Sequence, residues 1–466
     1  MHFNFSSTQS LIVDHLQSAG YSCWVVGGAI RDLLRQKAYK DIDFVTNATP
    51  LEVRSILSKE QLFFIPDQKA FEHGINRIVD QKTGLIIDLA TMRKDDQSDG
   101  RWANVSWTQN IIEDLSRRDF TINAIAAAVS SQGKVSELID PFGGQQDIID
   151  KVVRFVGNPL DRIEEDALRM IRACRFTALG EEWYSPETFI IRSKANNISS
   201  ISKERIRDEI LKGLQYSKPS NFFRSLRESQ LLEIIWPDLN ACWNVEQNSH
   251  HIESVFDHLM RTVDASVELS DKTLLRLAAL THDIGKPPTK TIDATGIHFY
   301  KHEIEGSVLI YRWMKQYHFS NNEIAYVTKM VRHHQFRFDD ASKPKAIRKW
   351  LHEVGKDDWR DLFILRSMDR AGNLLKMQQG KSIVTSKMRE LSEIIENMII
   401  SKIPIFKEDL AITGEDIKTL GISTGPIYKE IFSNILGLIL NDPSKNNKKW
   451  LLAYVEKMYG KKNNII

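Results

Sequence analysis

Strand-like and helix-like patterns of apolar and polar positions alternate over the first 150 residues of the chain. Residues 22–28 (SCWVVGG) have the apolar run of a buried strand and end in two glycines. Residues 41–46 and 85–93 alternate polar and apolar positions as half-buried strands do, and residues 117–129 predict a turn followed by a helix. This succession predicts a small mixed α/β domain.

From Pro159 onward the pattern is almost wholly helical. A turn-rich segment, 139–150, precedes the change and marks a domain boundary. A further region, with many histidines on helical segments, opens near residue 246. We therefore expect an α+β protein in four parts. They are a small mixed α/β head (1–150), a helical neck and body (151–245), an all-α histidine-rich domain (246–380) and a helical C-terminal tail (381–466).

The composition is that of a globular protein. Of the 466 residues, 42% are hydrophobic and 27% are charged, which excludes wholesale disorder, a collagen-like fibre and a coiled-coil rod. At about 150 residues per domain, the length predicts about three domains. Lys and Arg total 63 against 61 Asp and Glu, so the formal net charge is only +2. A surface that binds nucleic acid must therefore be local.

The sequence predicts neither export nor membrane insertion. The N-terminus lacks the basic start and apolar stretch of a signal peptide, and no apolar run approaches the roughly 20 residues of a membrane helix. Cys23, Cys174 and Cys242 are odd in number and far apart, so they predict neither a disulfide framework nor a zinc site. We expect a cytoplasmic protein without membrane contact.

Paired aspartates give the first candidate for chemistry. Gly27 and Gly28 end a predicted strand and open a helix, which lets the backbone approach a phosphate closely. Asp41 and Asp43 are two residues apart on a predicted strand, so both carboxylates point to one face. Two carboxylates on one face suit a pair of Mg²⁺ ions about 3.5–4 Å apart, one activating an attacking hydroxyl and one holding a triphosphate.

Alternative interpretations of these aspartates exist. A pair of this spacing alone is more often a solvated strand face or a turn, but the glycines, Arg31 and Asp32 before it favour the metal site. Asp88 lies on another alternating strand. It is a candidate third carboxylate or an ordinary polar residue at a strand edge.

Four motifs occur in a recognisable order, and they resemble those of one family. They are GGAIRDLLRQKAYKDIDFV (27–45), LIIDLATMRKDDQSDGR (85–101), RRDFTINA (117–124) and EEDALRMIRACRF (164–176). Together they resemble the DNA polymerase β-like nucleotidyltransferases, specifically the class II tRNA nucleotidyltransferases (CCA-adding enzymes) and their poly(A) polymerase relatives. The resemblance covers most of residues 15–245. It implies a polymerase β-like nucleotidyltransferase head, with Mg²⁺ held by Asp41 and Asp43.

A repeated spacing predicts how the base is read. Asp166, Arg169, Arg172 and Arg175 recur every three residues and would form one row along a helix. A carboxylate can accept from an exocyclic amino group and a guanidinium can donate to ring acceptors, so one Asp–Arg pair could read both CTP and ATP. The alternative is a solvated helix face with ion pairs. By the resemblance, Asp166 and Arg169 face the base, and Arg172 and Arg175 support the base and the triphosphate. The resemblance also implies nucleotide contacts from Gly27, Gly28, Arg31, Arg118, Asp119, Asn123 and Glu165.

Two departures from the family bear on specificity. The family loop usually reads close to DGRRP, whereas here Asp99-Gly100-Arg101 is followed by Trp102 and Ala103. The presence of the loop argues against an enzyme that adds only CC, while its altered composition leaves the switch from C to A addition open. Residues 66–79 (PDQKAFEHGINRIV) are closer to the sequence of tRNA-specific enzymes than to the RRFRL-like stretch of bacterial poly(A) polymerases. That favours tRNA over poly(A).

A second set of residues predicts another metal centre. The adjacent His282 and Asp283 can ligate one metal through nitrogen and oxygen. His258 and Asp369 would complete a four-ligand site, and His302 and His333 could hold a second ion. We expect His334 to be the non-ligating neighbour of His333, and His250 and His251 to belong to a linker or the surface.

This arrangement resembles the HD-superfamily metal-dependent phosphohydrolases. It implies a divalent transition metal of open identity, which would polarise a phosphoryl oxygen and lower the pKa of a bound water. The resemblance also implies that Lys286 contacts the scissile phosphate. HD remnants without activity exist, but the complete set of ligand types favours activity here.

We therefore expect template-independent addition of the 3′-terminal CCA to tRNA from CTP and ATP by a two-metal mechanism. The HD domain would hydrolyse terminal phosphate or 2′,3′-cyclic phosphate at RNA ends. tRNA, CTP and ATP are the expected partners, and no obligate protein partner is evident. The alternatives are an A-adding tRNA nucleotidyltransferase, a poly(A) polymerase, and an HD phosphohydrolase with a catalytically silent nucleotide- or RNA-binding head.

Overall fold

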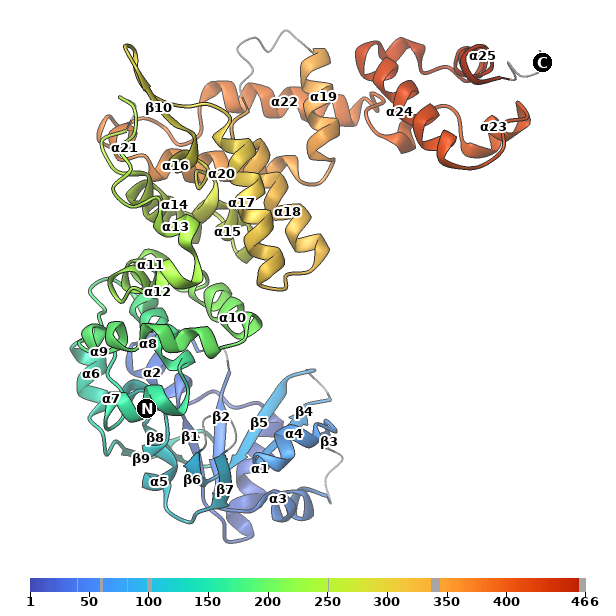
Figure 1. Ribbon diagram of the computed structural model, residues 1–466. Helices are drawn as coiled ribbons and strands as arrows, with labels where there is room; N and C mark the ends of the chain where they lie inside the picture. Colours follow the sequence, from blue (N-terminus) through green and yellow to red (C-terminus); the bar gives the residue numbers. More distant parts are fainter. Residues whose placement is uncertain are drawn as a thin grey trace. The chain divides into compact units, whose positions relative to one another are not determined.

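The computed structural model describes residues 1–39, 41–58, 62–81, 83–98, 103–249, 251–336 and 344–460. Asp99, Gly100, Arg101, Trp102 and His250 lie outside the described residues. The chain forms two compact units (Figure 1). The first contains Met1–Ala241 with Gln316–His318, and the second contains Cys242–Lys315 with Phe319–Ile466. The finer division into four parts remains a prediction.

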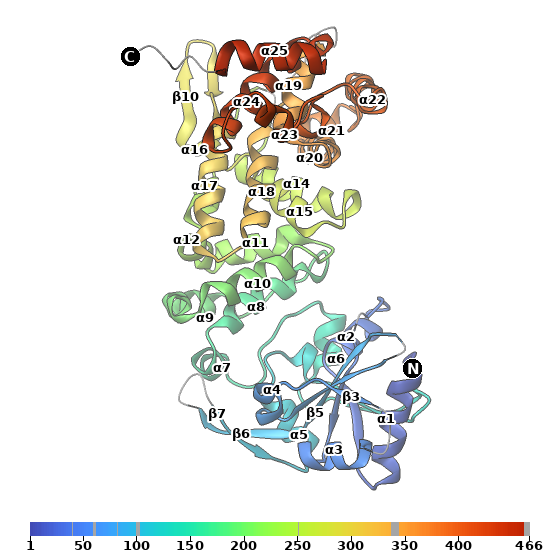
Figure 2. The same cartoon turned by 90° about the vertical axis from the view of Figure 1, so that its right-hand side faces the viewer.

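A mixed sheet organises the head of the first unit (Figures 1 and 2). Its described strands run in the order β3-β4-β5-β2-β1-β8-β9. Their bounds are β1 (Cys23–Val26), β2 (Asp43–Thr46), β3 (Phe63–Phe64), β4 (Ile75–Val79), β5 (Ile86–Thr91), β8 (Ala126–Val129) and β9 (Val135–Ile139). β2 pairs with β5 in parallel and with β1 antiparallel. A separate hairpin joins β6 (Arg93–Ser98) and β7 (Ala103–Trp107).

Helices accompany this sheet and confirm the mixed α/β head, but the helix predicted within residues 117–129 is wrong, because Ala126–Val129 pair with β1 as strand β8. They are α1 (Ser7–Ser18), α2 (Gly28–Leu34), α3 (Pro50–Leu57), α4 (Gln68–Glu72), α5 (Ile111–Ser116) and α6 (Gly144–Ile149). A capping box starts α1 at Ser6 and another starts α3 at Thr49, which satisfies the first backbone N–H groups of each helix. One face of the sheet buries a cluster that includes Val26 of β1, Val45 of β2 and Leu115 of α5.

The rest of the first unit is helical. Its helices are α7 (Pro159–Glu165), α8 (Leu168–Phe176), α9 (Thr188–Ser193), α10 (Lys203–Gly213), α11 (Pro219–Glu228), α12 (Leu231–Ile235) and α13 (Pro237–Asn240). α8 packs against both α10 and α11. Gly213 of α10 lies against the ring of Phe222, where a Cβ atom would fall 2.3 Å from a ring carbon, so only glycine permits this close approach.

The second unit is a helical bundle that carries one small hairpin, β10 (Lys290–Asp293) with β11 (Gly296–Phe299). Its first helices are α14 (Val255–Leu269), α15 (Thr273–Thr281), α16 (Lys286–Thr289), α17 (His302–Gln316), α18 (Asn321–His333) and α20 (Trp359–Gly372). α14 packs along both α15 and α20. The remaining helices are α19 (Pro344–Val354), α21 (Leu374–Gln378), α22 (Ser386–Ile400), α23 (Gly414–Thr419), α24 (Pro426–Asn441) and α25 (Lys448–Tyr459). Among the described residues, no helix has both the length and the apolar character needed to cross a membrane.

Candidate active sites

Strand register brings two of the predicted carboxylates together in the head. β2 and β5 are parallel, with Phe44 opposite Leu89 and Val45 opposite Ala90. Extending this register by one residue places Asp43 beside Asp88. Because side chains alternate between the faces of a strand, both aspartates point to the face that carries Val45 and Ala90. Asp41 lies just before β2 and is exposed.

The electrostatics of Asp43 show that these carboxylates act on one another. Desolvation raises the pKa of Asp43 above its ordinary value, the nearby Arg118 guanidinium opposes the rise, and the charges of Asp88 and Asp41 add to it. Like charges at one place repel unless a cation lies between them. The group of carboxylates is therefore suited to divalent cations with oxygen ligands, such as Mg²⁺.

Gly27 lies directly against this group. Its φ of +72° is a conformation that favours glycine, and it caps the start of α2. A Cβ atom at Gly27 would lie 3.4 Å from a guanidinium nitrogen of Arg118 and 4.0 Å from a carboxylate oxygen of Asp43. Arg118 in turn donates to the fully buried Asp114 at 3.0 Å. The glycine thus keeps the space beside the carboxylates open, and the arginine provides positive charge at its edge.

A hydrogen-bonded network connects the other predicted nucleotide contacts. Arg31 donates to the Asn123 side-chain oxygen at 2.9 Å and forms a two-point ion pair with Asp32. Asn123 donates to Asp119 at 3.2 Å, and Arg172 of α8 donates from Nε to Asp119 at 2.7 Å. Burial by itself raises the pKa of Asp119, but the charge of Arg172 together with the hydrogen bonds from Arg172 and Asn123 outweighs it, and the pKa is lowered. The network therefore couples the head sheet to the helical part of the same unit.

The predicted row of Asp166, Arg169, Arg172 and Arg175 is not on one continuous helix. α7 ends at Glu165, and Asp166 has an extended backbone, φ −156° and ψ 104°. Its carboxylate accepts from the backbone N–H of Leu168 at 3.1 Å, a local side-chain-to-backbone bond that competes with helix continuation just before Ala167, the N-cap residue of α8. The three arginines do share α8.

Each of these side chains already has a partner in the structure. Arg205 of α10, which the sequence analysis did not single out, donates to Asp166 at 2.7 Å. Arg169 is ion-paired with Glu165. Arg175 is buried and donates to Glu209 at 2.5 Å and to the Tyr216 hydroxyl. Arg175 therefore contacts side chains of the helical part in this structure, whereas Asp166 and Arg169 remain near the surface.

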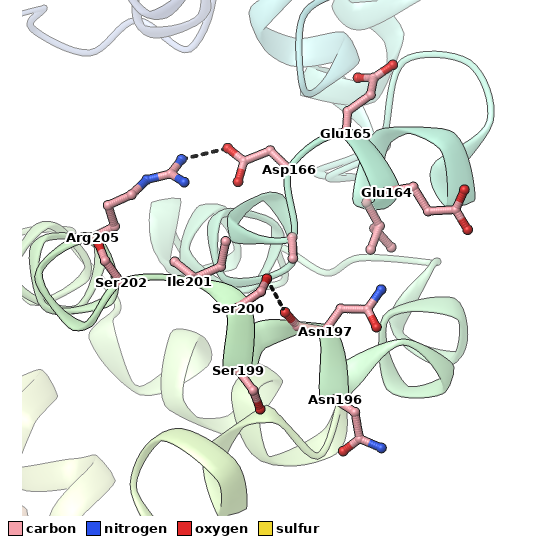
Figure 3. A pocket seen from close by; sticks show the side chains of 12 residues that line it. Glu164, Glu165, Asp166, Asn196, Asn197, Ser199, Ser200, Ile201, Ser202 and Arg205 are labelled. Carbon is pink, nitrogen blue, oxygen red and sulfur yellow. Dashed lines mark hydrogen bonds and ion pairs between the residues drawn. The ribbon is translucent and has the colours of Figure 1, made fainter. Parts of the chain in front are cut away.

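Asp166 and Arg205 also border a pocket of about 680 Å³ (Figure 3). Its wall combines the end of α7 with the turn before α10, and includes Glu164, Asn197 and Ser202. Figure 3 shows Arg205 and Asp166 reaching toward each other across one side of it. The pocket has both polar and apolar lining and is large enough for a nucleoside-sized group.

In the second unit, five predicted ligands and one further histidine form a buried cluster. The ligand atoms fall into two neighbouring sets, His258 with His282 and Asp369, and Asp283 with His302 and His334, and within each set the atoms lie within 4.8 Å of one another. His258 Nε2 lies 3.2 Å from both His282 Nε2 and Asp369 Oδ1. Asp283 joins the two sets, with Oδ2 at 3.2 Å from His282 Nε2 and Oδ1 at 3.1 Å from His302 Nε2.

His333 is not part of this cluster, and His334 is. His334 is buried, with Nε2 3.5 Å from Asp283 Oδ1, whereas His333 lines a separate depression with Tyr311 and Arg332. The prediction from the sequence, with His333 as the ligand and His334 as its non-ligating neighbour, is therefore the reverse of the arrangement in the structure. The physical reason is that α18 ends at His333, and His334 is the C-cap residue whose side chain turns inward. Adjacent residues on a helix point about 100° apart, so a doublet alone does not tell which one faces the core.

The hydrogen bonds of the histidine rings in this cluster favour the binding of a cation. Nδ1 of His302 and of His334 lies 2.8 Å and 2.7 Å from a backbone carbonyl oxygen, in position to donate to it. Their Nε2 lone pairs then face Asp283 Oδ1, a buried atom without a hydrogen-bond donor. Converging lone pairs on imidazole and carboxylate are the donor set of a metal centre. The residues present therefore fit a divalent metal.

Lys286 lies beside this cluster and is almost completely buried. Its Nζ is 2.7 Å from Asp283 Oδ2 and donates to the Gln247 side chain at 2.6 Å. Burial by itself raises the pKa of Asp283, but the charges of Lys286 and His282 hold it well below its usual range. The contact that the structure gives Lys286 is thus with a ligand carboxylate.

Comparisons with known proteins identify domains in both units. Residues 23–154 match the family described as "Poly A polymerase head domain", residues 186–242 match "Probable RNA and SrmB-binding site of polymerase A", and residues 255–371 match "HD domain". A CCA-adding enzyme of Staphylococcus aureus (strain bovine RF122 / ET3-1) is 36% identical over 220 residues, 46% of this chain and 52% of the relative. A Multifunctional CCA protein of Burkholderia cenocepacia (strain HI2424) is 33% identical over 278 residues, 57% of this chain and 64% of the relative. The chain thus spans between half and two thirds of the length of these relatives.

Solved structures share the fold. The crystal structure of Bacillus stearothermophilus CCA-adding enzyme in complex with CTP matches with a TM-score of 0.66 and 24% identity, over 96% of each chain. Thermotoga maritima CCA-adding enzyme complexed with tRNA matches with a TM-score of 0.52 and 17% identity, over 98% of this chain and 97% of that one. The chain therefore contains a poly(A) polymerase head domain, an RNA-binding segment of the polymerase A type and an HD domain, as the sequence motifs predicted.

Proposed function

We propose that this protein adds the 3′-terminal CCA to tRNA, using CTP and ATP and no nucleic-acid template. The observation that carries the proposal is the alignment of Asp43 with Asp88 on adjacent parallel strands, beside Arg118 and the open backbone at Gly27. The similarity to CCA-adding enzymes supports the choice of substrate. We propose a cytoplasmic location because tRNA and nucleoside triphosphates are cytoplasmic solutes.

In this mechanism Asp41, Asp43 and Asp88 supply the oxygen ligands for two Mg²⁺ ions. When bound, the ions contribute activation of the tRNA 3′-hydroxyl and charge neutralisation on the triphosphate. The hydroxyl attacks the α-phosphate and pyrophosphate leaves. Arg118 faces the same space and neutralises phosphate charge, and Gly27 lets the triphosphate approach the backbone. The Arg31–Asn123–Asp119–Arg172 network holds the segments around this space in place.

Base selection requires a rearrangement of ion pairs. Asp166 and Arg169 are the proposed readers of the base, but here they are paired with Arg205 and Glu165. The Asp166–Arg205 pair is partly exposed, and such pairs contribute about 1 kcal/mol or less, so an incoming base can replace it at little cost. Arg175, in contrast, is proposed to support α8 from within.

The test is nucleotide incorporation into tRNA that ends before CCA, with each nucleotide offered separately. CTP should be incorporated first and ATP only after two C residues. Incorporation of A alone would instead show an A-adding enzyme, and long A tails on unrelated RNA would show a poly(A) polymerase. Asp43→Asn should abolish incorporation, because it removes a ligand charge without changing the side-chain volume, whereas the exposed Glu246→Gln should have no effect. If the wild-type protein incorporates no nucleotide, the result would favour a head that binds nucleotide or RNA without catalysing transfer.

We also propose a second activity, hydrolysis of phosphate or 2′,3′-cyclic phosphate at RNA ends, in the HD domain. The supporting observation is the cluster of Asp283 with His302 and His334 on one side and His258, His282 and Asp369 on the other. Its imidazole-rich donor set suits a divalent transition metal better than Mg²⁺. When bound, the metal contributes polarisation of the phosphoryl oxygen and activation of water. Lys286 keeps Asp283 ionised and oriented.

Two adjacent histidines provide a matched test of the hydrolase. His334→Ala should reduce metal binding and phosphatase activity by at least tenfold, because it removes a ligand. His333→Ala should leave both within twofold, since His333 lies outside the cluster. Equal effects of the two substitutions would contradict the proposed ligand set.

A further inference from the structure

Three histidines of the HD cluster are oriented by the same kind of contact, from Nδ1 to a backbone carbonyl oxygen. Nδ1 of His282 lies 2.9 Å from the carbonyl oxygen of Ala279, and Nδ1 of His302 and of His334 lies at a similar distance from the carbonyl three residues earlier. A histidine that donates from Nδ1 presents the Nε2 lone pair to a metal. The backbone therefore fixes both the ring orientation and the tautomer of these three side chains.

His258 is oriented by a different partner. It lies within α14, completely buried, and its Nε2 points into the cluster at 3.2 Å from Asp369. Its Nδ1 faces the carboxylate of Glu253, with Oε1 at 3.5 Å. Glu253 precedes the N-cap residue of α14, so the chain places it one turn away from His258 on the outer side of the cluster.

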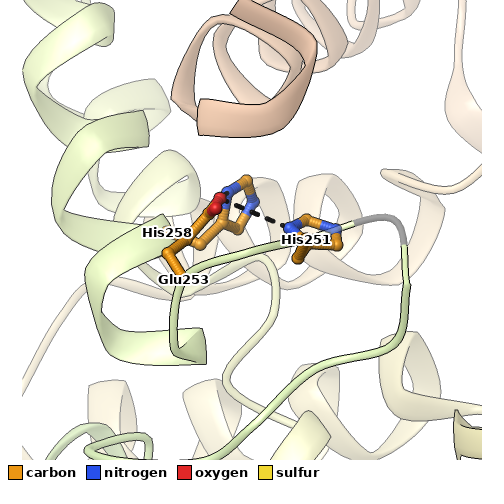
Figure 4. A group of neighbouring side chains, drawn as sticks. All are labelled: His251, Glu253 and His258. Atoms are coloured by element: carbon orange, nitrogen blue, oxygen red, sulfur yellow. Dashed lines mark hydrogen bonds and ion pairs between the residues drawn. The ribbon is translucent and has the colours of Figure 1, made fainter. Parts of the chain in front are cut away.

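Glu253 is itself held from several directions. Its Oε1 accepts from the backbone N–H of Leu374 at 3.2 Å, and its Oε2 accepts from the backbone N–H of Ile252 at 3.2 Å. Nδ1 of His251 is 3.5 Å from Oε1 (Figure 4), and the His251 ring lies against the amide of Asn373 at 3.2 Å. The carboxylate is therefore a fixed, buried anion rather than a mobile surface group. His251, predicted from the sequence to lie on a linker or the surface, has a side chain that is only 11% exposed.

We propose that Glu253 is a positioning residue for His258: its negative charge facing Nδ1 holds the ring proton there, directs Nε2 into the metal cluster and makes the imidazole a stronger ligand. His251 and Asn373 hold the carboxylate in place. This role rests on the proposed metal centre of the HD domain. A carboxylate behind a ligating histidine raises its basicity, and loss of such a partner typically costs about 10–100-fold in metal affinity.

The competing interpretation is that His251, Glu253 and His258 bind a metal ion directly. One ligand atom each from His251, Glu253 and His258 lies within 4.8 Å of the others, so the three could in principle hold an ion of their own. The two uses exclude each other at His258, because an Nδ1 that ligates a metal cannot carry a proton for Glu253. The positioning role is favoured because His258 Nε2 faces Asp369 and His282 in the larger cluster, which leaves Nδ1 to carry the proton that faces Glu253.

The experiment is a Co²⁺ titration of the full chain in excess Mg²⁺, followed by calorimetry and by the visible d–d absorption of the bound ion. Glu253→Ala should weaken binding by about 10–100-fold with unchanged stoichiometry. Glu253→Gln keeps an acceptor oxygen but not the charge. Its Co²⁺ affinity should lie between those of Glu253→Ala and the wild type. Glu246→Gln, at an exposed position of the preceding segment, is the control. Circular dichroism of the metal-free variants checks that each is folded.

A double-substitution cycle separates positioning from a general structural effect. In a His258→Ala background, Glu253→Ala should cause no further loss of affinity, because the residue through which it acts is gone. An equal loss in both backgrounds would overturn the proposal. So would a stoichiometry that falls by one ion in His251→Ala, which would show direct ligation. If His282→Ala binds Co²⁺ as the wild type does, the metal centre itself is wrong, and the role of Glu253 falls with it.

Discussion

Gly27 shows how one residue without a side chain shapes the head site. Its φ of +72° disfavours any other residue, and its Cα faces both Arg118 and Asp43. We predict that Gly27→Ala lowers nucleotide incorporation at least tenfold, because the methyl group enters the space proposed for the triphosphate. The measurement is steady-state kcat and KM for CTP.

Gly20 provides the control for this substitution. It also has a positive φ, +87°, but a Cβ atom there would meet nothing within 4 Å. Gly20→Ala should therefore cost stability, about 1–2 kcal/mol for the left-handed backbone, without a specific loss of activity. If both variants lose activity in proportion to stability, the position of Gly27 beside the carboxylates is irrelevant.

At the scale of elements, the buried ion pair between α8 and α10 sets the stability of the helical part. The side chains of Arg175 and Glu209 are 5% and 3% exposed. Removing one partner of a buried pair typically costs about 3–5 kcal/mol, since the other charge remains in the interior. We predict that Arg175→Met lowers the free energy of unfolding by about 3 kcal/mol, at the low end of this range, because Lys212 and Arg172 still approach Glu209. Urea unfolding followed by fluorescence measures this loss.

A substitution at another arginine, Arg205 of α10, gives the contrast. Arg205→Met removes the partner of Asp166, and the Arg205 side chain is 42% exposed. It should change the free energy of unfolding by less than about 1 kcal/mol but alter KM for CTP and ATP. The reverse pattern, a stability loss for Arg205→Met and a KM change for Arg175→Met, would contradict the assignment of the two arginines.

The start of α9 carries a pH-dependent contact. Desolvation raises the pKa of Glu187 to about 7 from an ordinary value of 4.5, against the opposing effects of the Phe155 N–H and Arg154. The folded protein therefore binds more protons than the unfolded chain between these values. The resulting stabilisation is complete below pH 4.5 and is lost as the pH rises through 7. Glu187→Gln lacks this titration, so its Tm should rise relative to the wild type from pH 5 to pH 8; parallel Tm profiles would contradict the prediction.

At the scale of the whole molecule, the two proposed chemistries reside in different compact units. The head carboxylates belong to the first unit and the histidine cluster belongs to the second. We predict that Asp43→Asn abolishes nucleotide incorporation and leaves phosphate hydrolysis within twofold, and that His282→Ala does the reverse. Both activities are measured on the same preparations. Loss of both activities in either variant would show that the sites depend on each other.

Sequence reasoning succeeded where function depends on local spacing. The period-two pattern around Asp43 and Asp88 reports which face each side chain occupies, and the order of the motifs identified both domains. It failed where a neighbouring element decides. Nothing near Asp166 in the sequence shows that its carboxylate will bind the Leu168 N–H where the helix is interrupted, and nothing near Arg205 shows that it will reach Asp166, 39 residues away.

The sequence by itself determined the chemistry available to this protein: the aspartates of the head, the arginines of α8 and the histidines and aspartates of the HD domain. Residue type and short-range periodicity suffice for that, because they are properties of the chain. Tertiary structure alone decided that His334 rather than His333 enters the cluster, that Arg175 is buried against Glu209 and that Glu253 lies behind His258. These outcomes depend on where helices end and what they pack against, which long-range burial sets and local sequence does not encode.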